Sequence, residues 1–286
     1  MKLKLIECPR DAMQGIKQLI PAELKAAYIN TLLKVGFDTI DFGSFVSPKA
    51  IPQMQDTVEV LKQLDLSSTR SKLLAIIANT RGAEEACQHQ EITYLGFPFS
   101  ISETFQQRNT NSSIAESLIR VEEIQNLCVK HNKQLVVYIS MAFGNPYNDE
   151  WSSDTVIKWT SKLHQMGVRI LALSDTIGVS DKTNISYLFS KLIPEFKDVE
   201  FGAHLHSRKE SSQEKINAAY TNGCLRFDSA VHGFGGCPMA KDDLTGNIAT
   251  EDIELYFDGK AIELGLNKEA LTSAYEESWK IFNHYH

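Results

Sequence analysis

The chain has 286 residues, 43% of them hydrophobic, and a formal net charge of −7 at pH 7. A chain of this length and apolar content can bury a full core, so we expect a single globular domain over residues 1–286. The acidic balance and the lack of a dense Lys/Arg cluster exclude a nucleic-acid partner, because phosphate binding needs a positive surface.

The sequence also indicates where the protein works. It has no apolar run of about 18 residues, the length of a membrane span, and its first ten residues are too charged for a signal peptide. Five cysteines are scattered without CxxC spacing, which fits reduced thiols better than a disulfide framework or a zinc ribbon. We therefore expect a cytoplasmic protein with no membrane partner.

Strand and helix patterns alternate along the chain. The first strand is predicted at 3–7, and Pro21 begins a helix that ends at Gly36. Further strands are predicted at 37–42, 73–78, 92–97, 135–140, 168–173, 199–206 and 225–231, with helices near 53–64, 83–89, 113–128, 154–167, 185–193 and 213–222. Ser113 and Glu116 have capping-box spacing, and Asp154 is the predicted cap of its helix.

Eight strand–helix units favour parallel strands, and in a chain of this length they suit a closed (β/α)8 (TIM) barrel better than an open doubly wound sheet. No Gly-x-Gly-x-x-Gly follows the first strand, which argues against a dinucleotide fold. We predict the barrel over about 1–235, and a cysteine loop with additional C-terminal helices over about 233–286. The segment 267–286 has apolar helical spacing and is expected to pack on the barrel or on a second subunit of a homodimer.

Polar side chains follow several of the predicted strands, at the positions that line the reaction site of a parallel barrel. They are Arg10, Asp11, Asp41, Asn79, Asp175, His204, His206 and the loop 233–247. His204 and His206 lie two residues apart on a strand, so both imidazoles can face one ion. Taken alone, the pair fits core or solvent hydrogen bonding equally well.

Asp11 beside the two histidines would make a mixed nitrogen and oxygen site, and the amide oxygen of Asn247 could complete it. Such a donor set suits Mg²⁺ or Mn²⁺, with Zn²⁺ or Co²⁺ as alternatives. Arg10 would point away from Asp11 on a strand, unless a bend turns both inward. It is therefore either a surface ion-pair partner or a fixed cation for a developing oxyanion.

Several segments resemble the 3-hydroxy-3-methylglutaryl-CoA lyase family of the DRE-TIM metallolyase superfamily, in the same order and spacing nearly from end to end. They are Pro9-Arg10-Asp11, residues 44–49 with 52–54, Asp175-Thr176-Ile177-Gly178-Val179, and Gly235-Gly236-Cys237-Pro238 through Gly246-Asn247 and Ala249-Thr250-Glu251-Asp252. The cysteine loop separates this lyase from the synthases, aldolases and carboxyltransferases of the superfamily, which share mainly the Arg-Asp and His-x-His parts.

The resemblance implies a lyase that cleaves 3-hydroxy-3-methylglutaryl-CoA into acetyl-CoA and acetoacetate, with a divalent cation and no organic cofactor. It implies as metal ligands Asp11, His204, His206 and Asn247; as catalytic residues Arg10, Asp11, Asp41 and Cys237; and as substrate-binding residues Gln14, Ser44, Asp175 and Thr176. Arg10 would hold the thioester oxygen, Asp41 would orient Arg10, and Cys237 would transfer a proton on the acetyl product.

This chain departs from the family pattern at five places. Ser207 replaces an Asp, Arg208-Lys209 a Tyr-Gly pair, Val136 an arginine, Val137 a glycine and Asn145 a cysteine. A lyase for a related acyl-CoA and a synthase of the same superfamily therefore stay open, as does, with less support, a barrel that binds acyl-CoA without turnover.

Overall fold

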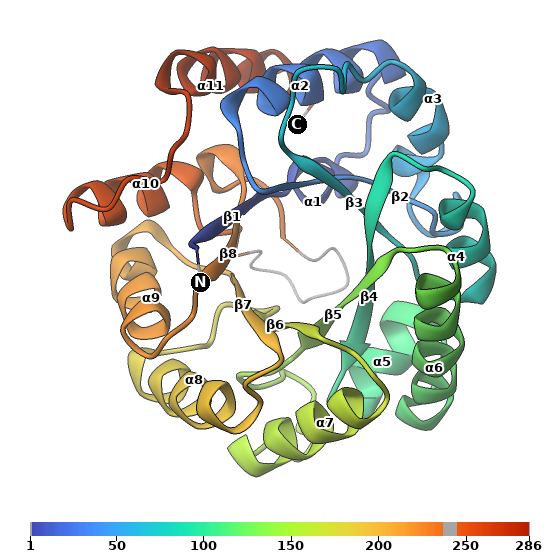
Figure 1. The fold of residues 1–286 in the computed structure, drawn as a ribbon, viewed down its shortest axis with the longest axis vertical. Helices are drawn as coiled ribbons and strands as arrows, with labels where there is room; N and C mark the ends of the chain where they lie inside the picture. Colours follow the sequence, from blue (N-terminus) through green and yellow to red (C-terminus); the bar gives the residue numbers. More distant parts are fainter. Residues whose placement is uncertain (1, 237–244, 286) are drawn as a thin grey trace.

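The computed structural model describes residues 2–236 and 245–285, and its centre is a closed barrel of parallel strands (Figure 1). The strands are β1 (Lys4–Glu7), β2 (Thr39–Ser44), β3 (Lys72–Ile76), β4 (Ile92–Ser100), β5 (Gln134–Ser140), β6 (Ile170–Asp175), β7 (Glu200–Leu205) and β8 (Arg226–Ser229). Each strand pairs with its neighbour in sequence, and β8 closes the ring against β1 with Leu5 opposite Phe227. The predicted (β/α)8 barrel is confirmed.

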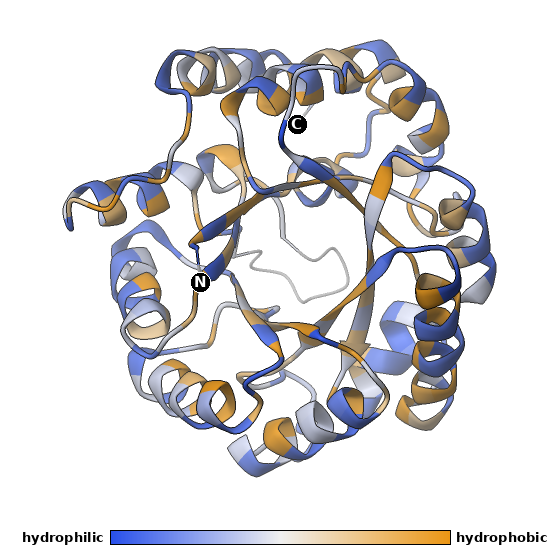
Figure 2. Ribbon diagram, viewed as in Figure 1, coloured by the Kyte–Doolittle hydropathy of each residue, from blue (hydrophilic) through white to orange (hydrophobic). Residues whose placement is uncertain are grey.

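Helices form the outer layer of the barrel. They are α1 (Pro9–Gln14), α2 (Ala22–Val35), α3 (Thr57–Lys62), α4 (Thr80–Cys87), α5 (Glu103–Thr110), α6 (Ile114–Lys130), α7 (Ser153–Gln165), α8 (Lys182–Glu195), α9 (Lys209–Thr221), α10 (Thr250–Asp258) and α11 (Lys268–Phe282), with short 3-10 turns at Pro52–Met54 and Val231–Gly233. Figure 2 shows hydrophobic and hydrophilic stretches on both the strands and the helices. No helix in the described part of the chain is long and apolar enough to cross a membrane.

Local sequence explains where several helices begin and end. Gly36 closes α2 with φ +86°, a left-handed conformation that glycine adopts without strain. The capping box of Ser113 and Glu116 is present at the start of α6, as predicted. The prediction that Asp154 caps α7 was wrong. Ser152 accepts the hydrogen bond from the Thr155 N–H at 3.1 Å, and Asp154 lies in the first turn, where its charge favours the helix dipole.

The C-terminal helix α11 packs on the barrel layer beside α2 (Figure 1). Phe282 is buried and meets the Tyr28 ring edge-on at a centroid distance of 6.2 Å. Trp279 stacks on His232 at 4.3 Å, just past β8. These aromatic contacts tie the end of the chain to the segment that leads out of the last strand.

Candidate active site at the carboxyl end of the barrel

Arg10 and Asp11 lie on α1, a short helix that follows β1 directly. Pro9 takes the first helical position, where its missing N–H is not needed and its fixed φ favours the helix. One helical turn brings Arg10, Asp11 and Gln14 together, and all three line a pocket at the carboxyl end of the barrel. On a strand, Arg10 and Asp11 would point to opposite sides. This helix is the bend that turns both side chains towards the same site.

His204 lies in β7 and His206 follows its end, with ring centroids 5.5 Å apart. Asn247 is placed beside the two histidines by backbone pairing with the end of β7. Residues 246–248 return along the end of β7, where the Ile248 N–H donates to the Leu205 carbonyl at 3.1 Å and Asn247 lies opposite His206.

Asn247 is also held from the other side. Its Nδ2 donates to Asp11 Oδ2 at 2.6 Å and to the Phe234 carbonyl at 3.0 Å. A Cβ on Gly235 would lie 2.7 Å from this Nδ2, and the φ of Gly235 is +106°. Only glycine lets the backbone pass here, so part of the glycine-rich segment is explained by close packing on Asn247.

The donor set fits a divalent cation. One ligand atom each from Asp11, His204 and His206 lies within 4.8 Å of the other two. His206 is 2% exposed, and its Nδ1 has no hydrogen-bond partner among the described residues. A buried imidazole nitrogen without a partner is costly unless something binds it, and a cation would do so.

The charges of the site suit this role. Burial alone would raise the pKa of the Asp11 carboxyl, but Arg10 and the two histidines hold it below its usual value. Burial, together with His204, lowers the pKa of His206 to about 4. At neutral pH the site therefore offers an ionised carboxylate and a neutral imidazole, the forms that bind metal.

The structure places the remaining candidate residues in two groups. Gln14, Ser44 and Thr176 line the same pocket as Arg10, Asp11, His204 and His206. Asp41 does not line it, but its carboxylate forms an ion pair with Arg10. Asp175 and Asn79 do not line this pocket. Asn79 caps α4 by accepting from the Gly82 N–H, and Asp175 accepts from the N–H groups of Val179 and Ser180 and from Lys215.

The departures from the family pattern also lie off the pocket lining of the described chain. Val136 is buried inside the barrel with Tyr94 and Tyr138. Asn145 organises its own loop by accepting from the N–H groups of Tyr147 and Asp149, and Ser207 donates to the Arg208 carbonyl. Cys237 lies outside the described residues.

Sequence reasoning missed the wall of the pocket that α5 contributes, namely Phe105, Asn109 and Thr110. The signal was Ser102, whose hydroxyl accepts from the Phe105 N–H and caps this helix. Asp228 was missed as well. It accepts from His204 Nδ1 at 3.0 Å, and no motif marks it because its partner is 24 residues away in sequence.

The closed barrel and this polar cluster define a (β/α)8-barrel enzyme with a candidate site for a divalent cation. Its sequence matches the HMGL-like family model over residues 3–277. It is 34% identical to the 3-hydroxy-3-isohexenylglutaryl-CoA/hydroxymethylglutaryl-CoA lyase of Pseudomonas aeruginosa, over 96% of this chain and 90% of that protein. It is 31% identical to the hydroxymethylglutaryl-CoA lyase YngG of Bacillus subtilis, over 93% and 88%.

The fold is also similar to that of a solved lyase structure. The HMG-CoA lyase of Acenitobacter baumannii, in complex with coenzyme A and 3-methylmalate, superposes with a TM-score of 0.91 at 28% identity, covering 99% of this chain and 92% of that one. The chain belongs to the HMGL-like family.

Proposed function

We propose that this protein cleaves 3-hydroxy-3-methylglutaryl-CoA to acetyl-CoA and acetoacetate, using a divalent cation and no organic cofactor. The observation that carries the proposal is the convergence of Arg10, Asp11, His204 and His206 on one pocket. The names of the Pseudomonas and Bacillus relatives support the substrate, and the coenzyme A bound to the structural relative supports an acyl-CoA.

Asp11, His204 and His206 would hold the cation. In the structure Asn247 meets Asp11 through its amide nitrogen, so the role it shows is to hold the carboxylate, and ligation by its oxygen is part of the proposal. The oxygen donors suit Mg²⁺ or Mn²⁺, the cations proposed here, and the two imidazoles keep Zn²⁺ and Co²⁺ as alternatives. A divalent cation bound here would lower the pKa of a hydroxyl group that approaches it, so the hydroxyl group would lose its proton more easily.

The reaction breaks the bond between C2 and C3 of the acyl chain. The C3 hydroxyl loses its proton and its oxygen becomes the keto oxygen of acetoacetate. The electron pair of the broken bond passes to C2 and spreads onto the thioester oxygen. C2 then takes up a proton to complete acetyl-CoA. The site must therefore accept one proton, stabilise an enolate and return one proton.

The residues of this chain can meet these three needs. Asp11 is ionised and can accept the hydroxyl proton. Arg10 stays charged, because the carboxylates of Asp41 and Asp11 raise its pKa more than burial lowers it, and it can donate to the thioester oxygen as negative charge forms. Cys237, by the family resemblance, would return the proton to C2.

The test is product analysis with a panel of acyl-CoA thioesters. Purified protein with Mg²⁺ or Mn²⁺ should release acetoacetate from 3-hydroxy-3-methylglutaryl-CoA, and chelation should abolish the release until the cation is restored. No product from any thioester, with the cation bound, would overturn the proposal. Full turnover by protein shown to be metal-free by elemental analysis would overturn the metal assignment.

A matched pair of variants tests the ligand role. His206→Ala should weaken Mn²⁺ binding strongly, because it removes a direct ligand. His164→Ala is the control: this histidine lies on the surface beside Asp198, and its loss should leave Mn²⁺ binding unchanged. A His206→Ala protein that is less stable but binds Mn²⁺ as tightly as the wild type would make His206 a packing residue.

A further inference from the structure

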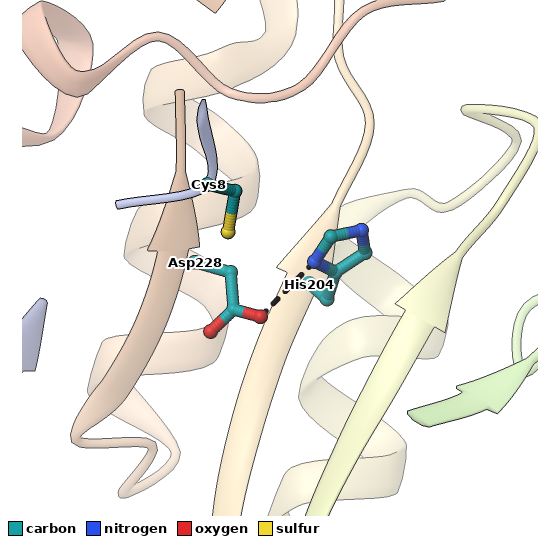
Figure 3. A group of neighbouring side chains, drawn as sticks. All are labelled: Cys8, His204 and Asp228. Carbon is teal, nitrogen blue, oxygen red and sulfur yellow. Dashed lines mark hydrogen bonds and ion pairs between the residues drawn. The ribbon is translucent and has the colours of Figure 1, made fainter. Parts of the chain in front are cut away.

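The two ring nitrogens of His204 have different surroundings. Nδ1 lies 3.0 Å from Asp228 Oδ2, on the neighbouring strand β8. Figure 3 shows this contact and shows the other ring nitrogen turned away from Asp228. Since Nδ1 is engaged by Asp228, Nε2 is the nitrogen that remains for a cation shared with Asp11 and His206.

The contact also decides which nitrogen carries the hydrogen. A carboxylate only accepts hydrogen bonds, so in the neutral imidazole the hydrogen lies on Nδ1 and the Nε2 lone pair is free. Asp228 is 2% exposed, which shields the pair from competing water. Arg226, buried on the same strand, supplies positive charge close to the carboxylate and is itself held by Glu200 at 3.0 Å.

We propose that Asp228 is a positioning residue for the metal centre. By accepting the Nδ1–H hydrogen bond, it orients the His204 ring and fixes the tautomer whose bare Nε2 faces the cation. Carboxylates that bind the far nitrogen of a ligand histidine act in this way in general. The inference rests on the proposed function, because it presupposes that His204 is a metal ligand.

A competing interpretation uses the same side chains. Cys8, His204 and Asp228 also lie close enough to hold an ion among themselves (Figure 3). That site would need Nδ1 as a ligand and Cys8 as a thiolate. Instead Nδ1 is bound to Asp228, and the Cys8 thiol faces the Ile6 carbonyl at 3.9 Å, with burial and nearby carboxylates raising its pKa. We therefore conclude that Asp228 holds His204 in place and is not itself a ligand of a second ion.

The first test is Asp228→Asn, which keeps the shape of the side chain. An amide can donate to Nδ1 and so leave the hydrogen on Nε2, where it blocks the cation. Titration of the metal-free protein with Mn²⁺ alone, followed by electron paramagnetic resonance, should show affinity weakened about 10–100-fold. The control is Asp198→Asn, which alters a surface carboxylate 3.0 Å from a ring nitrogen of His164 and should leave Mn²⁺ affinity unchanged.

The second test needs no altered carboxylate. In Mg²⁺-loaded wild-type protein with ¹⁵N-labelled histidine, His204 should show the Nδ1–H tautomer, its signals assigned by their loss in His204→Gln. The Co²⁺-loaded protein should show no thiolate-to-metal absorption band.

The outcomes separate the two proposals. Equal Mn²⁺ affinity of wild type and Asp228→Asn, an Nε2–H tautomer, or a thiolate band lost in Cys8→Ser would each overturn the role of Asp228 while leaving the lyase proposal in place. A wild-type protein that binds no Mn²⁺ would overturn the metal centre itself.

Discussion

Arg10 binds Asp41 through two nitrogens: Nε lies 3.0 Å and Nη2 2.5 Å from Asp41 Oδ2. Its Nη1 donates to Asp11 at 3.0 Å and to Gln14 at 2.9 Å. The guanidinium is therefore fixed before substrate arrives, and one Nη2 hydrogen has no partner within residues 2–236 and 245–285. A donor fixed in this way costs no reorganisation when charge develops on the substrate.

Arg10→Met should therefore lower kcat by about a hundredfold or more, the scale of losing one oxyanion donor, with little change in KM. Asp41→Asn should show a milder loss of the same kind, because Asp41 only holds Arg10. Steady-state kinetics on folded variants checks both. A variant of Arg10 whose KM rises while kcat holds would give this residue a docking role instead.

The sequence predicted the part of this arrangement that is periodic. Strand alternation places His204 and His206 on one face, and eight strand–helix units place β1 beside β8. The sequence left open whether Arg10 points to the surface or into the site. The answer depends on α1, a helix of six residues that is too short to show periodicity. Its one local signal was Pro9, which fits a first helical position as well as a loop.

Asp175 shows why position at a strand end does not settle function. Its carboxylate accepts from Val179, Ser180 and Lys215, which leaves it turned to the loop after β6. Sequence neighbours cannot reveal Lys215, because it lies 40 residues away on α9. The same holds for Asp228 with His204, since both pairs form only when the barrel closes.

We expect Asp175→Asn to act on stability rather than on substrate binding. The change would leave the Lys215 ammonium, 2.9 Å away and buried, without its counter-charge, which costs about 3–5 kcal/mol. Urea unfolding measures this loss. The control is Glu214→Gln, which breaks an exposed pair with Lys182 and should cost under about 1 kcal/mol. A raised KM with unchanged stability would show instead that Asp175 binds substrate.

Glu7 gives the fold a pH dependence. It is fully buried at the end of β1, where its oxygens accept from the Val231 N–H at 2.8 Å and the Thr250 hydroxyl at 2.6 Å. Burial raises its pKa from 4.5 to about 8, although the hydrogen bonds from Thr250 and Val231 oppose this. Below pH 4.5 the carboxyl is neutral in both folded and unfolded chains. As pH rises towards 8 the unfolded chain loses the proton first, so stability falls.

Glu7→Gln should remove that fall, which is on the order of a few kcal/mol. The amide can accept from Val231 and donate to Thr250, so the two proteins should have similar unfolding free energies near pH 4.5, and the variant should be more stable near pH 8. Urea unfolding across this range gives both curves. Parallel curves would show that Glu7 does not hold its proton in the folded state.

The last prediction concerns Cys237, which lies outside the described residues and to which the family resemblance gives the return of the proton to C2. The other four thiols, Cys8, Cys87, Cys128 and Cys224, are buried. Burial raises the pKa of each, to about 12 for Cys128 and Cys224, so they carry almost no reactive thiolate at neutral pH. Iodoacetamide should therefore modify Cys237 first, and bound substrate should protect it.

Activity should fall in step with labelling of Cys237, as mapped by mass spectrometry. Cys237→Ser should keep Mn²⁺ and acyl-CoA binding but lose most of the cleavage rate, because a serine hydroxyl has a far higher pKa than a thiol and exchanges a proton with carbon poorly. Cys224→Ser is the control, and its inactivation by iodoacetamide should follow the wild type. Complete labelling of Cys237 without loss of rate would remove it from the reaction and favour the synthase alternative.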